Sequence, residues 1–127
     1  MPRPPKPTAA ELQILHVLWR RGPSTVNQVQ PELQHGDRVA YTTVLKLLQI
    51  MFEKGLVRRD ESTRPHVFRA AVAAAQVQRR FVSDLLDQVF EGSATSLAMQ
   101  ALSVKRATRE EVRQLRKLLD QIEGDES

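Results

Sequence analysis

The segment from Tyr41 to Gly55 constrains the fold more than any other part of the sequence, because it has the pattern of an amphipathic helix. Its apolar residues recur at i, i+3, i+4 and i+7, which places them on one side of a helix; they are Val44, Leu47, Leu48 and Met51. Thr42, Lys46 and Gln49 fall together on the opposite side. That side is polar but carries little charge, which suits hydrogen bonding to base edges in a DNA major groove.

The residues before this segment predict two further helices. Thr8 and Glu11 have the spacing of a capping box at the start of a helix that runs to about Arg21, where Gly22-Pro23 ends it. A second helix begins near Thr25, is shortened or kinked by Pro31, and ends at Gly36-Asp37.

A β-hairpin is expected after the third helix. Residues 56–60 and 66–69 are short β-prone runs that flank a polar turn containing Pro65. Three helices followed by a hairpin is the winged helix-turn-helix arrangement, in which the third helix enters the major groove. Trp19 is expected in the core, against the third helix or the base of the hairpin.

Helical periodicity returns at Ala73 and predicts three more helices. The first, up to Gly92, has an apolar face wide enough to contact both its own domain and a second subunit. The second spans about 94–104, with Leu97, Ala101 and Leu102 turned inward, and the third opens with a Thr108–Glu111 capping box. Apolar residues of the third step by three, four and three, the spacing of a helix–helix seam. The expected dimerisation residues are Phe81, Leu85, Val89, Leu97, Leu102, Val112, Leu115, Leu119 and Ile122.

These elements give a mainly α fold with a small β-hairpin wing. We expect a disordered arm at 1–7, where four prolines occur, a winged-helix DNA-binding domain at 8–72, a helical dimerisation domain at 73–123 and a polar tail at 124–127. Residues 1–70 carry a charge of +5 and residues 71–127 a charge of −1, which sum to the +4 of the whole chain. A basic first part followed by a near-neutral amphipathic part suggests a polyanion-binding module joined to an assembly module.

The expected DNA contacts lie on the third helix and on the hairpin. They are Tyr41, Thr42, Thr43, Lys46 and Gln49 on the helix, and Arg58, Arg59 and Arg64 on the hairpin. Tyr41 and Lys46 suit phosphate contacts as well as base contacts. The alternative is that these residues form an ordinary solvated surface, and Asp60 and Glu61 are placed to neutralise Arg58 or Arg59.

The sequence offers no basis for catalysis or for a cofactor. It has no cysteine, so disulfides and thiolate metal sites are excluded, and His16, His35 and His66 are too scattered for a metal site. No phosphate-binding loop or nucleophile motif occurs. No apolar run approaches the roughly 18 residues that a membrane span needs, and the N-terminus has no secretory signal pattern. We therefore expect a cytoplasmic protein that is not an enzyme and does not insert into membranes.

Several of these segments together resemble the penicillinase-repressor family of bacterial transcription regulators, the BlaI/MecI type. The resemblance rests on residues 40–45, on Leu48-Gln49 and on residues 53–57, with support from 11–15, Leu18-Trp19 and 85–92, and it extends over about 8–123.

This resemblance implies a homodimeric repressor in which each winged helix binds half of a dyad operator. Members repress genes for β-lactamases, penicillin-binding proteins or, in a branch with a C-terminal cysteine cluster, metal transport; the lack of Cys does not fit that branch. In the β-lactam branch a membrane sensor peptidase triggers cleavage of the repressor, which by alignment would fall near Gln100-Ala101. The Asn-Phe pair of other members is absent there, and Ile50 and Phe52 also depart from the family pattern.

Two other functions remain open from the sequence alone. A winged helix that uses Ile50 or Phe52 to bind a protein would give a protein-interaction module without specific DNA reading. A nucleoid-type protein would bind DNA with no operator preference.

Overall fold

The structure is a computed structural model that describes residues 5–34 and 38–126. The helix α1 (Ala9–Arg21) begins as its capping pattern predicts: the Thr8 side chain accepts from the Glu11 N–H at 3.2 Å, and Glu11 accepts from the Thr8 N–H at 2.9 Å. A second capping box, between Thr25 and Gln28, opens α2 (Val26–Val29). Pro31 follows within a 3₁₀ turn, η1 (Gln30–Glu32), so the second helix is short. The expected end of that helix, Gly36-Asp37, lies outside the described residues.

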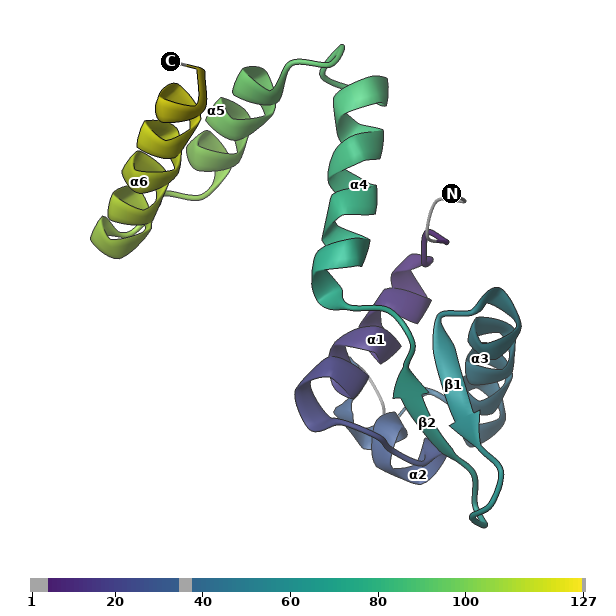
Figure 1. The fold of residues 1–127 in the computed structure, drawn as a ribbon. Coiled ribbons are helices and arrows are strands. Elements are labelled where there is room, and N and C mark those ends of the chain that lie inside the picture. The colour runs from purple at the N-terminus through teal and green to yellow at the C-terminus, as the bar shows by residue number, and fades with distance from the viewer. Residues whose placement is uncertain (1–4, 35–37, 127) are drawn as a thin grey trace. The chain divides into compact units, whose positions relative to one another are not determined.

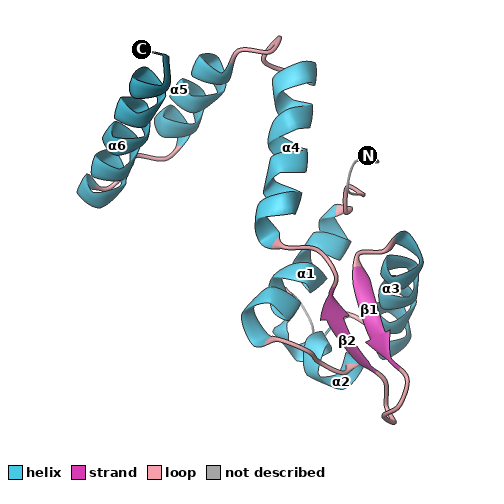
Figure 2. Ribbon diagram, viewed as in Figure 1, coloured by secondary structure: helices cyan, strands magenta, loops and turns pink. Residues whose placement is uncertain are grey.

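The helix α3 (Tyr41–Lys54) has the predicted bounds and the predicted buried side. It ends at Gly55, whose left-handed conformation, with φ 82°, is one that glycine adopts without strain. The hairpin follows as strands β1 (Val57–Asp60) and β2 (Val67–Ala70), paired antiparallel. Figures 1 and 2 show these strands beside α3 and α1, at the edge of the three-helix cluster.

Apolar residues from α1, α2, α3 and the hairpin form one core. Its fully buried members include Ile14, Leu15, Val29, Val44, Leu48, Met51 and Leu56, each with no exposed surface. Trp19 lies at the edge of this core, and its indole N–H donates to the Val72 carbonyl at 2.9 Å, so it anchors the chain that leaves the hairpin.

The chain divides into two compact units, the first ending at Ser83 and the second beginning at Asp84. This boundary lies inside α4 (Ala74–Gln88) and not at residue 73, because Val77 is buried in the core of the first unit and Phe81 packs against it. The first unit also holds part of the expected N-terminal arm: Pro7 is buried, and the Lys6 ammonium lies 4.9 Å from the centre of the Phe81 ring.

The second unit contains the end of α4, α5 (Ala94–Val104) and α6 (Arg109–Glu126). The predicted Thr108–Glu111 capping box is present, with hydrogen bonds of 2.9 and 3.1 Å. The helix α6 continues through Gly124 to Glu126, so the expected tail at 124–127 is wrong for its first three residues. Glycine lowers helix stability but does not force an end.

Few apolar side chains of this unit are covered by the chain itself. Leu97 is half-buried as expected, but Ala101 and Leu102 are exposed, and Leu102 keeps 45% of its surface. Their predicted inward orientation is therefore wrong for the single chain. Among the helices of the described residues, none is long and apolar enough to cross a membrane.

Candidate nucleic-acid interface

The outer side of α3 is a polar surface open to solvent. Thr42, Thr43, Lys46 and Gln49 are all exposed, and Tyr41 at the start of the helix keeps 39% of its surface. The opposite side is fixed in the core by Val44, Leu48 and Met51. Their burial sets the rotation of the helix about its axis and confirms the orientation that the sequence predicts.

The N-terminus of α3 presents backbone donors that have no partner among the described residues. Its N-cap residue, Ala40, has no side chain that can accept a hydrogen bond, and its carbonyl accepts from Thr43 and Val44. Within the described residues, the N–H groups of Tyr41 and Thr42 have no hydrogen-bond partner. These donors and the positive end of the helix dipole favour an anion at this position.

The hairpin is attached to the helices by backbone pairing. Ser24 exchanges two hydrogen bonds with Phe68, of 2.9 and 2.8 Å, which adds a third short strand-like segment beside β2. Phe68 is buried, and its β1 partner in the register is Arg59.

The opposite face of the hairpin carries two arginines. Arg58 and Arg69 are directly opposite each other in the register, and both are exposed. Like charges at such positions are unfavourable without a counter-charge. They border a hollow of about 370 Å³.

Arg59 has a different environment from the other hairpin arginines. Its guanidinium lies 4.3 Å from the centre of the Phe52 ring and is paired with Glu61, whose Oε1 accepts from Arg59 Nε at 2.9 Å. The expected neutralisation by Glu61 is confirmed. In this arrangement Arg59 covers one face of Phe52, and it has to leave Glu61 before it can bind a phosphate with its full charge.

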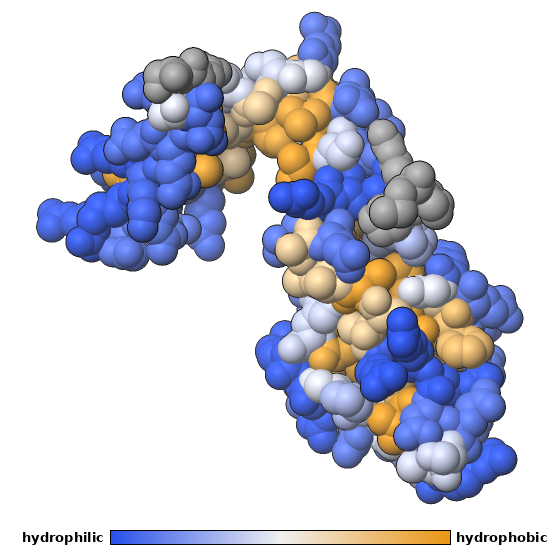
Figure 3. Space-filling view, in the orientation of Figure 1, coloured by the Kyte–Doolittle hydropathy of each residue, from blue (hydrophilic) through white to orange (hydrophobic). Residues whose placement is uncertain are grey.

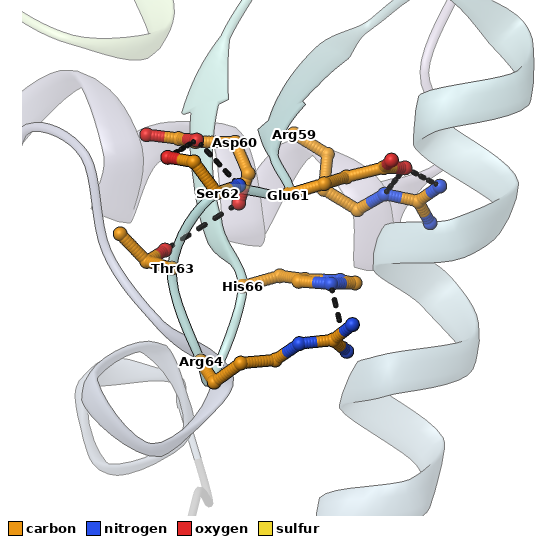
Figure 4. A network of polar contacts seen from close by, with 7 residues as sticks. All are labelled: Arg59, Asp60, Glu61, Ser62, Thr63, Arg64 and His66. Carbon is orange, nitrogen blue, oxygen red and sulfur yellow. Dashed lines mark hydrogen bonds and ion pairs between the residues drawn. The ribbon is translucent and has the colours of Figure 1, made fainter.

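Arg64 lies at the tip of the hairpin and points back toward α3. Its Nη1 is 3.4 Å from His66 Nε2, and Figure 4 shows the two side chains side by side. Both border a small hollow of about 140 Å³ together with Tyr41. The turn itself is held by Asp60, which accepts from the Ser62 hydroxyl and N–H; these bonds lower the pKa of Asp60 below its usual value. The turn therefore brings a basic residue close to the start of α3.

Histidine and carboxylate groups do not gather into a metal site in the described part of the chain. His16 makes an edge-to-face contact with Trp19, and His35 lies outside the described residues.

Residues 7–121 match the penicillinase repressor family. The chain belongs to this family. It is 31% identical over 115 residues to the transcriptional regulator BlaI of Mycobacterium tuberculosis, covering 90% of this chain and 83% of the relative. It is 18% identical over 113 residues to the methicillin resistance regulatory protein MecI of Staphylococcus aureus, covering 89% and 92% of the two chains.

The fold is that of a known family structure. The solution structure of the monomeric form of Bacillus licheniformis BlaI, in complex with the blaP half-operator, aligns with a TM-score of 0.50 at 22% identity. The alignment covers 60% of this chain and 93% of that one. As a penicillinase repressor, the protein is a DNA-binding transcriptional repressor with a winged helix.

The residues expected at the dimer interface of this penicillinase repressor divide into two groups. Phe81 packs against the core of the first unit, and Leu97 and Val112 are half-buried. The others keep between 38% and 62% of their surface exposed: Leu85, Val89, Leu102, Leu115, Leu119 and Ile122. Figure 3 shows hydrophobic side chains at the surface around the end of α4.

The expected cleavage residues Gln100 and Ala101 are exposed but lie inside α5. Sequence reasoning missed the pairing of Ser24 with Phe68 and the ion pair between Glu11 and Lys54. Arg69 lies at the alternating strand position that faces away from the core, as its register partner Arg58 does.

Proposed function

We propose that this protein is a sequence-specific repressor that binds a dyad operator as a homodimer. The observation that carries this proposal is the exposed polar side of α3, which is held at a fixed rotation by a buried apolar side. In a winged helix-turn-helix protein, that side is the one presented to the major groove.

The proposed contacts on α3 fall into two kinds. Thr42, Thr43, Lys46 and Gln49 would meet base edges, since hydroxyl, ammonium and amide groups can donate or accept in the major groove. The Tyr41 hydroxyl and the N–H groups at the helix start would hold a phosphate, which positions the helix without reading sequence.

The hairpin would add phosphate contacts on one side of α3. Arg64 is the strongest candidate because it is exposed at the tip and close to Tyr41. Arg58 is exposed on the outer face, whereas Arg59 is already engaged by Glu61 and Phe52. We therefore rank Arg64 and Arg58 above Arg59 as DNA contacts.

The apolar surface of α4 to α6 supports the proposed homodimer. A second subunit would cover residues that one chain leaves exposed, and two winged helices at a fixed separation would match two half-sites related by dyad symmetry. Repression would be steric, with the bound dimer blocking access to the promoter.

An unbiased selection of bound DNA sequences tests this proposal, followed by binding assays with variants. We expect selected sequences to contain a dyad repeat. Lys46→Ala is expected to weaken specific binding, and Gln49→Ala to relax preference at one base pair by about 1–3 kcal/mol.

Arg20→Ala is the matched control for loss of one positive charge, because Arg20 is exposed and belongs to α1, outside α3 and the hairpin. Equal affinity for the selected DNA and for random DNA would contradict sequence-specific reading and favour a nucleoid-type protein.

We further propose that the regulated genes concern β-lactam resistance or the cell wall, and that a membrane sensor peptidase releases repression by cleavage near Gln100-Ala101. Proteases bind extended chain, so cleavage there requires local unfolding of α5, where both residues are exposed but helical. Co-expression with a sensor peptidase encoded nearby, under β-lactam treatment, should yield a fragment ending close to residue 100. A chain that stays intact under β-lactam treatment would overturn the proposed cleavage and leave the proposed DNA binding unaffected.

The alternative of a protein-interaction module rests on the exposure of Phe52, which keeps 38% of its surface. The Arg59 guanidinium stacks on that ring and reduces the apolar area available to a partner. Retention of a protein partner at high salt by a protein that does not bind DNA would favour this alternative.

A further inference from the structure

The charges of α6 are divided along the helix. From Arg109 to Lys117 the helix has four basic and two acidic residues, whereas every charged residue from Leu118 onward is acidic. Acidic residues at the end of a helix face the negative end of its dipole, and the last turn contains no basic residue to offset them. The sequence of α6 is therefore not arranged for the stability of this helix alone.

Part of this division lies on a single line along the helix. Arg109, Arg113, Arg116, Asp120 and Glu123 are spaced by four, three, four and three residues, which keeps them on one side. The line is basic in its first part and acidic in its second. It runs beside the apolar seam, since Val112 borders the same hollow as the arginines.

The basic part of this line is short of counter-charges. Arg106, Arg109, Arg113 and Arg116 border one hollow of about 680 Å³, and no acidic residue lines it. Arg113 pairs with Glu110 at 2.6 Å, but in the described part of the chain no ion pair reaches the other three arginines. Asp120 and Glu123 likewise have no ion-pair partner among the described residues.

The apolar seam next to this line also lacks a partner. Leu115, Leu118, Leu119 and Ile122 keep 38%, 51%, 59% and 48% of their surface exposed. The midpoint of these four residues lies at Leu118-Leu119, which is also where the line changes from basic to acidic. An antiparallel copy of α6 crossing at this point would cover the seam and place acidic residues against basic ones at both ends.

We propose that α6 pairs antiparallel with α6 of a second copy of this chain, across a two-fold axis near Leu118-Leu119. Arg113 and Arg116 of each subunit then lie against Asp120 and Glu123 of the other. This proposal rests on the homodimer of the proposed function and adds the direction of the pairing and the residues that select it. Parallel pairing would place like charges together and is disfavoured.

Two charge-reversal variants of the full chain test the pairing. One carries Arg113→Glu and Arg116→Glu, and the other carries Asp120→Arg and Glu123→Arg. Each variant alone places like charges across the axis twice, so we expect its homodimer dissociation constant to rise by at least about ten-fold. Mixing the two variants restores opposite charges at both contacts, so the mixture should form heterodimers about as tightly as the original protein.

The mixture is measured by analytical ultracentrifugation with one variant labelled, and circular dichroism of each variant checks that helix content is retained. Lys105→Glu with Arg79→Glu is the control, because it changes the charge by the same amount at exposed residues outside α6. Heterodimers that form no better than the homodimers would overturn the proposal, as would unchanged homodimers of both variants.

The outcome also separates this proposal from others. If only the arginine variant is affected and mixing gives no recovery, Arg113 and Arg116 support the dimer through contacts other than Asp120 and Glu123, and the antiparallel pairing is wrong. If the original protein is dimeric and selects a dyad operator while mixing fails, the antiparallel pairing is wrong and the proposed function stands. If the original protein is monomeric, both are wrong.

Discussion

Glu11 is a carboxylate with only 1% of its surface exposed, held by two residues distant from each other in the chain. Lys54 at the end of α3 donates to both carboxylate oxygens at 2.9 Å, and the Thr8 N–H donates to one of them. Burial raises the pKa of Glu11, but the Thr8 N–H and the Lys54 ammonium outweigh it, so the pKa lies below its usual value of 4.5. The ion pair therefore ties the start of α1 to the end of the proposed recognition helix.

Glu11→Gln should lower the free energy of unfolding by about 1–3 kcal/mol at pH 7, because it leaves Lys54 without its charged partner. A group whose pKa is depressed on folding contributes stability above its unfolded pKa, and this contribution is lost as the pH falls through the folded value. The difference between the variant and the original protein should shrink below about pH 4.5. Urea unfolding at several pH values measures it, with Glu53→Gln on the exposed side of α3 as control; a difference independent of pH would contradict the ion pair.

Individual caps and buried side chains were predictable because their signals are local. Thr8 with Glu11, Thr25 with Gln28, and the apolar spacing of α3 each lie within one or two helical turns. The contact between Glu11 and Lys54 spans 43 residues, and no local pattern encodes it. The same holds for the hydrogen bond from Trp19 to Val72, whose approximate location in the core was predicted but whose partner was not.

The hairpin is an element whose role depends on where its turn points. Its arginines were evident from the sequence, but their alternation about the strands gives them different surroundings: Arg59 faces Phe52 and Glu61, whereas Arg58 and Arg69 face outward. The alternation of residues along a strand shows which face of the hairpin each arginine occupies only when the pairing register of the strands is known. In the register of this hairpin, Arg58 is opposite Arg69 and Arg59 is opposite Phe68.

Removing the charge at the hairpin tip should weaken binding to all DNA sequences alike. Arg64→Ala is expected to lower the affinity for selected and for random DNA by similar factors, and to reduce the slope of log affinity against log salt by about 0.9, the value for one phosphate contact. Fluorescence anisotropy over a salt series measures both. Arg79→Ala on α4 is the matched control; a loss confined to the selected sequence would instead indicate that Arg64 reads a base.

Among the helices, α4 shows where sequence periodicity stops being informative. Its wide apolar face predicted contact with two surfaces, and the structure shows the first of them, formed by Val77 and Phe81 on the core. Val82, Leu85 and Val89 remain exposed. Periodicity identifies which residues are apolar on which side, but it does not say whether the same chain or another covers them.

At the scale of the whole molecule, the boundary between the two units lies inside α4. The two units are therefore joined by a continuous helix and not by a loop. The sequence predicts the boundary earlier, at residue 73, because helical periodicity returns there. Burial of Val77 places the start of α4 with the DNA-binding unit. In the proposed homodimer, a disturbance of the second unit would act on a helix that also belongs to the first unit.

Cleavage between α5 and α6 should therefore weaken binding to the full dyad operator but not binding to a half-site. A specific protease site inserted at residues 105–107, in the connection between these helices, would release α6 and its exposed apolar seam on cutting. Two linked half-sites bind far more tightly than one because the second contact is intramolecular, and the gain reaches about 10²–10⁴. We expect cutting to lower the affinity for a full dyad by about that factor while the affinity of one unit for a half-site changes little. Gel shifts with both DNAs before and after cutting measure this, and retention of full dyad affinity by the cut protein would show that α4 and α5 suffice for assembly.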